Sequence, residues 1–134
     1  MTLLKNIPLM AVVLAIYNLS ALSGDDSLHK ILFEAKLMSG GDFVLDFAHF
    51  MLFLGIIFLA AEVIKSTRTA NSSIVDHGLS IVVLIIFIVE FITVKKCGTA
   101  TFLVLTFMSL VDVIVGFTVT LSSAKRDVNY GNNN

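Results

Sequence analysis

The sequence predicts an all-α integral membrane protein, a four-helix bundle of transmembrane spans with a short amphipathic surface helix between the first two. Two observations predict this class. Of the 134 residues, 57% are hydrophobic and only 14% are charged, whereas soluble domains average roughly 45–50% apolar and about 25% charged residues. The apolar residues also gather into four runs that short polar segments separate. We therefore expect residues 1–134 to form a single membrane domain.

The run at about 99–121 is the clearest span. It holds about twenty apolar residues, enough as a helix to cross a hydrocarbon core of roughly 30 Å. Asp112 lies near its middle, where a carboxylate costs at least about 2.5 kcal/mol unless it is protonated, paired or hydrated. A stripe of small or polar residues recurs there at helical spacing: Ser109, Asp112, Gly116 and Thr120. We expect this stripe to pack against other helices, with Asp112 directed inward or toward another subunit.

The other three spans are predicted at about 7–22, 43–64 and 74–94. The first is the weakest apolar run, with Tyr17 and Asn18 in its later half. Lys5, the apolar run and the small residues before Gly24 also resemble a secretory signal peptide. We favour a retained span, since the run is somewhat long for a signal core. A tight turn before the last span forces the third and fourth spans into an antiparallel hairpin.

The surface helix is predicted within residues 24–42. Gly40 and Gly41 would end this helix. The segment is too short to span, so it either lies along the membrane surface or packs on the bundle as a connecting helix. Its apolar side chains recur at the spacing of one helical face, at Leu28, Ile31, Leu32, Ala35 and Met38.

The lysines and arginines indicate the orientation in the membrane. With four spans, one side carries five of them: Lys5, Lys65, Arg68, Lys125 and Arg126. The other side carries four: Lys30, Lys36, Lys95 and Lys96. This bias favours cytoplasmic termini, and a bacterial inner membrane is the default location because no eukaryotic targeting segment is found. Residues 127–134 lack apolar content and are predicted to be a disordered tail.

Depth along antiparallel helices sorts the polar side chains into two layers, since residues equidistant from a turn lie at similar depth. The first layer holds Asp46, His49 and Glu90, with Asn18 nearby. The second layer, near the basic loop, holds Glu62, Asp76 and His77. Asp112 is placed between the layers, in neither.

We consider the first layer the better functional candidate, because burial would raise its carboxyl pKa values toward neutrality and let the groups share protons or bind a cation. The structural alternative is that these groups reach headgroup water or lysines. The second layer has a stronger structural explanation in snorkelling and helix capping. Asp112 either binds a proton or cation, or joins helices as a protonated acid.

The sequence gives little support for catalysis. It lacks HExxH, GxSxG and Gly-rich phosphate-binding motifs, and its single cysteine, Cys97, excludes an intrachain disulfide. Helical rise separates His49 from His77 by about 18 Å, so they cannot ligate one haem iron. We therefore expect no enzyme, no cofactor and no catalytic or metal-ligating residue. The net charge of -1 argues against a nucleic-acid partner.

Two functional hypotheses follow. The leading one is a non-enzymatic subunit or accessory factor of a larger membrane complex. The chain is small, and its polar stripe, which includes Ser109, suits contacts between helices. The alternative is a small oligomeric channel or transporter, coupled to protons or cations through Asp112 or the first layer. The expected partners are the lipid bilayer and other membrane proteins or further copies of the chain.

Overall fold

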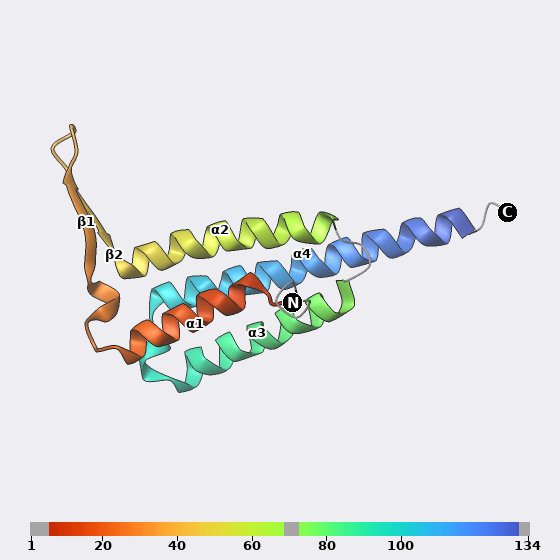
Figure 1. Cartoon of the computed structure of the whole chain (residues 1–134), viewed down its shortest axis with the longest axis horizontal. Helices are drawn as coiled ribbons and strands as arrows, with labels where there is room; N and C mark the ends of the chain where they lie inside the picture. The colour runs from red at the N-terminus through yellow and green to blue at the C-terminus, as the bar shows by residue number, and fades with distance from the viewer. Residues whose placement is uncertain (1–5, 69–72, 132–134) are drawn as a thin grey trace.

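The computed structural model describes residues 6–68 and 73–131. In these ranges four α-helices form a bundle, and a two-stranded hairpin projects from one end of it (Figure 1). The helices are α1 (Leu9–Leu22), α2 (Phe47–Arg68), α3 (Ser73–Thr93) and α4 (Ala100–Gly131). The strands are β1 (Ile31–Lys36) and β2 (Asp42–Asp46), and the connections hold the 3-10 turns η2 (Ser27–His29) and η3 (Lys95–Cys97).

Three of the described helices, α2, α3 and α4, are long and apolar enough to cross a membrane. They contain 22, 21 and 32 residues, whereas a crossing needs about 20. Only 17% to 28% of the residues in their apolar stretches are buried within the protein. The remaining apolar side chains face outward, as they do in helices that contact lipid, so the structure supports a transmembrane protein.

The first of the four predicted spans is too short to cross a bilayer by itself. α1 has 14 residues and is about 21 Å long. Pro8 sets its start, because proline lacks an N–H group and disfavours helical backbone in the residue before it. α1 instead packs into the bundle, where it contributes the buried residues Met10, Val13, Leu14, Tyr17 and Ala21.

The core joins α1 to the other three helices. The Tyr17 ring packs on Phe102 of α4, with centroids 4.8 Å apart, and Phe102 contacts Phe87 of α3 at 5.3 Å. All three side chains are fully buried. The Tyr17 hydroxyl also bonds to the Thr99 hydroxyl at 2.7 Å, and the Thr99 oxygen accepts the Phe102 N–H at 3.1 Å, which caps α4. Aromatic packing and this cap fix α1 against the start of α4.

The predicted surface helix is wrong, because its residues form an antiparallel β-hairpin. In the turn, the Leu37 N–H donates to the Gly41 carbonyl at 2.9 Å, and Gly40 has a φ of +85°, which glycine adopts at little cost. The two glycines therefore build a hairpin turn instead of ending a helix. Residues 43–46, which were predicted to begin the second span, belong to β2, and α2 begins at Phe47.

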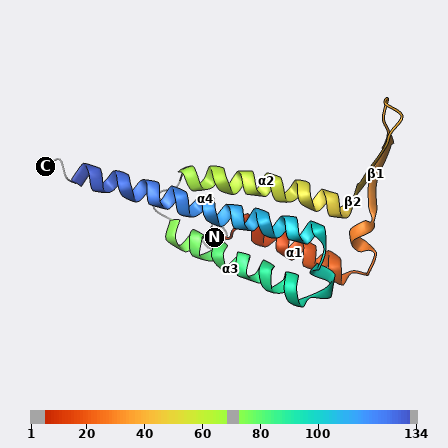
Figure 2. The same ribbon diagram turned by 180° about the vertical axis from the view of Figure 1, so that it is seen from behind.

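α4 extends well beyond the ends of α2 and α3, as both views show (Figures 1 and 2). It remains helical to Gly131, so the tail predicted to be disordered from residue 127 is helical over its first part. Residues 132–134 of that tail lie outside the described residues, as does Lys5.

Candidate functional site

A polar cavity lies between α2, α3 and α4, at the end of the bundle opposite the hairpin (Figure 1). Its volume is about 40 Å³, room for about three or four water molecules at roughly 10–15 Å³ each. The charged and polar side chains around it include Glu62, Lys65, Asp76, His77, Ser80 and Asp112. No group of three or more His, Cys, Asp or Glu side chains in the described ranges is arranged to hold a metal ion.

Asp112 supplies one of the cavity's carboxyl groups from α4. Its side chain is buried, with 8% of the residue exposed, and Oδ2 has no hydrogen-bond partner among the described residues. Ser80 on α3 lines the same cavity beside this carboxyl group. A buried polar atom without a partner carries a desolvation cost, so Oδ2 requires a proton, a water molecule or a cation.

His77 supplies a second such atom from α3. Its Nδ1 is buried and has no hydrogen-bond partner among the residues that the structure describes. The imidazole stacks on Phe117 with ring centroids 5.9 Å apart. A Cβ at Gly116 would lie 3.0 Å from Nδ1. Gly116 thus gives the imidazole room to lie against α4, and the cavity is lined by an unpartnered atom from each of two helices.

Glu62 connects the cavity to α1. Its buried carboxylate accepts a hydrogen bond of 2.6 Å from the Leu9 N–H through Oε1, while Oε2 lies 3.7 Å from Lys65 Nζ. Leu9 is the first residue of α1, where backbone N–H groups lack intrahelical partners and carry partial positive charge. Glu62 therefore has a structural role at the start of α1 in addition to its place in the cavity.

The structure groups the side chains of the two predicted layers differently from the depth count. The second layer does line one cavity, and Asp112, which depth alone placed in neither layer, belongs to it. The depth count puts Asp112 level with Ile81, next to Ser80. Ser80 lies only one helical turn from His77, and side chains bridge that distance, so Asp112 lines the same cavity as His77. Ser80 was not predicted, although its spacing from Asp76 and His77 puts all three on one face of α3.

The first predicted layer does not form one site. Asp46 Oδ1 accepts the His49 N–H at 2.8 Å and contacts the His49 ring at 2.6 Å, while 60% of the His49 side chain is exposed. The His49 N–H lowers the pKa of Asp46, and the His49 ring lowers it further. Glu90 instead accepts a hydrogen bond of 2.8 Å from Asn18. Within the described residues, no hydrogen bond or ion pair joins Glu90 to Asp46 or His49.

Ser109 lies inside the bundle but outside the cavity lining. Only 1% of it is exposed, and its hydroxyl oxygen has no hydrogen-bond partner among the described residues. It shares the buried face of α4 with Leu105 and Asp112. A small residue at this position lets neighbouring helices approach α4 closely.

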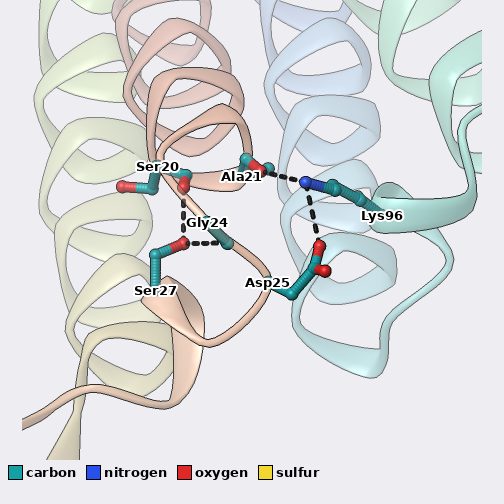
Figure 3. A network of polar contacts seen from close by, with 6 residues as sticks. All are labelled: Ser20, Ala21, Gly24, Asp25, Ser27 and Lys96. Atoms are coloured by element: carbon teal, nitrogen blue, oxygen red, sulfur yellow. Dashed lines mark hydrogen bonds and ion pairs between the residues drawn. The ribbon is translucent and has the colours of Figure 1, made fainter.

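A second polar network lies at the other end of α1 (Figure 3). Lys96 Nζ donates to the Ala21 carbonyl at 2.9 Å and lies 3.1 Å from the Asp25 carboxylate. The Ser27 hydroxyl contacts the Ser20 and Gly24 carbonyls. An ammonium group near the last carbonyls of a helix offsets the negative end of the helix dipole, so Lys96 stabilises the end of α1.

Comparisons with known proteins identify no relative of this chain. No family profile, no curated protein and no solved structure matches it significantly. The function is therefore inferred from the cavity and the surface of the protein.

Proposed function

We propose that the protein binds a proton or a small cation in the cavity between α2, α3 and α4, and that this binding drives transport across the membrane. One observation carries the proposal: Asp112 Oδ2 and His77 Nδ1, both buried and without hydrogen-bond partners in the described residues, line a water-sized cavity. Ionisable groups inside a membrane are costly, and they typically mark proton or ion pathways.

The side chains of the cavity suit different parts of this role. Asp112 is the group that would accept the proton or the cation, with the Ser80 hydroxyl beside it. The unpartnered Nδ1 of His77 makes this imidazole the second acceptor. Glu62 has less freedom, because its carboxylate is engaged by Leu9 and Lys65. Water in the cavity would connect these groups.

The proposal includes a placement in the membrane. The start of α1 and the C-terminal part of α4 lie toward the cavity end of the bundle (Figure 1). That end also carries Lys65, Arg68, Lys125 and Arg126. We therefore place the cavity end and both termini on the cytoplasmic side of a bacterial inner membrane, following the distribution of basic residues.

Reconstitution into liposomes tests the proposal. The purified protein is expected to carry a pH-dependent or cation-dependent flux, measured with an enclosed pH-sensitive or ion-sensitive dye. Asp112→Asn keeps the size of the side chain but removes its charge, and should abolish the flux. Asp46→Asn is the matched control, since it makes the same change at the opposite end of the bundle and should retain flux. Unchanged flux in Asp112→Asn, or no flux in the unaltered protein, contradicts the proposal.

The second candidate is a non-enzymatic subunit of a larger membrane complex. The observation that favours it is the large exposed apolar surface of the hairpin and the helices, which another membrane protein could cover. Purification in mild detergent should then recover the protein with a partner or with further copies of itself. A stable complex whose function survives Asp112→Asn would support this role over transport.

A further inference from the structure

The hairpin has two chemically different faces. Residues directly opposite each other in an antiparallel pair project from the same face of the sheet. One face is wholly apolar and is formed by the pairs Phe33–Leu45 and Ala35–Phe43. The other is mostly charged and includes the pairs Glu34–Val44 and Lys36–Asp42. The hairpin is therefore amphipathic.

The apolar face is poorly covered by the rest of the described chain. Phe33 and Phe43 contact each other, with ring centroids 6.3 Å apart, yet they remain 56% and 40% exposed. The turn adds Leu37 and Met38, which are also exposed. An isolated two-stranded hairpin is marginally stable in water, so this face requires an apolar surface to rest on.

The position of the hairpin indicates which surface that is. β2 leads directly into α2, and the Phe47 N–H donates to the Lys30 carbonyl at 3.0 Å, which ties the base of the hairpin to the start of the helix. The strands run across the axis of the bundle in both views (Figures 1 and 2). Because α2 is long and apolar enough to span the membrane along that axis, the hairpin extends along the plane of the membrane surface.

We propose that the hairpin is a membrane-surface anchor whose apolar face lies on the lipid interface beside the bundle. Phe50 and Phe53, in the first turns of α2 directly after β2, are exposed apolar side chains as well. Phe33 and Phe43 enter the boundary between headgroups and acyl chains, while Glu34, Lys36 and Asp42 face headgroups and water. This inference does not depend on the transport role, since it involves no residue of the cavity.

Tryptophan substitution tests this arrangement in the full-length protein. The chain contains no tryptophan, so a single introduced indole reports on one position. Phe33→Trp and Phe43→Trp probe the apolar face, and Glu34→Trp is the control on the charged face. In phosphatidylcholine vesicles with brominated acyl chains, the two apolar-face variants should be quenched about threefold more than the control. Aqueous iodide should give the opposite order.

Two results would overturn the proposal. Equal quenching of Phe33→Trp and Glu34→Trp by brominated lipid would show that the faces do not differ in lipid contact. Protection of Phe33→Trp and Phe43→Trp from both brominated lipid and iodide would show that protein, such as a second copy, covers the face. Each variant must first unfold at the same temperature as the unaltered protein. If Phe33→Trp or Phe43→Trp does not fold, the other variant still tests the apolar face.

Discussion

The Glu62 carboxylate of α2 accepts a hydrogen bond of 2.6 Å from the backbone N–H of Leu9, the first residue of α1. At the other end of the same helix, Lys96 Nζ donates to the Ala21 carbonyl. A carboxylate at the positive end of a helix and an ammonium at its negative end both stabilise it. α1 is thus held at each end by a charged side chain from elsewhere in the chain, and Glu62 joins this anchoring to the cavity.

Glu62→Ala is expected to lower the free energy of unfolding by about 1.5–3 kcal/mol, since it removes a buried, charge-assisted hydrogen bond. Thermal unfolding in detergent, followed by circular dichroism, measures the change. Glu34→Ala on the charged face of the hairpin is the control. Glu34 is exposed, so its replacement should have little effect on the free energy of unfolding. Similar midpoints for Glu62→Ala and the unaltered protein would contradict the role of Glu62 at α1.

Gly55 lies where α2 packs against α4. A Cβ at this position would lie 2.7 Å from Leu105 Cδ2 and 2.9 Å from Met108 Sδ. Leu105 is fully buried and has little room to move, so Gly55→Ala should destabilise the protein by about 1 kcal/mol or more. Gly78→Ala in α3 is the matched control, because nothing lies within 4 Å of its added Cβ. That variant should gain roughly 0.5–1 kcal/mol from reduced backbone freedom in the unfolded chain. Equal unfolding midpoints for the two alanine variants would be inconsistent with close packing at Gly55.

Asp46 caps the start of α2 by accepting the His49 N–H. Asp46→Ala should cost about 1 kcal/mol, whereas Asp46→Asn should cost less because asparagine also caps helices. The pKa of Asp46 is lowered in the fold, so its charged form stabilises the protein above the ordinary carboxyl pKa of 3.8. That contribution disappears as the pH falls through the lowered pKa. Unfolding of the unaltered protein and Asp46→Asn should therefore converge in acid, and a constant difference would argue against a lowered pKa.

Cys97 in η3 is fully buried. Burial raises the pKa of its thiol above the ordinary 9.0, and the nearby Glu90 carboxylate raises it further. Because the thiolate is the reactive form, maleimide should modify the folded protein at least about tenfold more slowly than the unfolded protein. Mass spectrometry follows the reaction, and Glu90→Gln should accelerate it in the folded state. Equal rates in folded and unfolded protein would mean that Cys97 is accessible.

The hairpin shows where sequence reasoning failed. Leu28, Ile31, Leu32, Ala35 and Met38 fit the period of a helix, but Phe33 and Ala35 also alternate as in a strand. Short apolar segments commonly fit both periods. The outcome depends on pairing with β2 and on the turn at Gly40 and Gly41, which are contacts between segments and not a property of either one. The pair Gly40 and Gly41 was the signal in the sequence that favoured a hairpin turn, since one glycine is enough to end a helix.

The polar layers show a partial success. Counting residues from the turns brought Glu62, Asp76 and His77 together, because helical rise fixes depth along antiparallel helices. The same counting placed Glu90 with Asp46 and His49 and separated Asp112 from the cavity. Depth does not specify which way a side chain points around its helix, and that rotation depends on how the helices pack.

The amino-acid sequence alone predicted a membrane protein with four apolar spans and an acid in the last of them, and three of those spans are long apolar helices in the structure. Apolar run length follows directly from bilayer thickness, so no tertiary information is needed. Only the tertiary structure decided that α1 is short and held at both ends, that the first loop is an amphipathic hairpin, and that Asp112 and His77 share a cavity. Those features depend on contacts between residues far apart in the chain, and such contacts arise only when the helices pack.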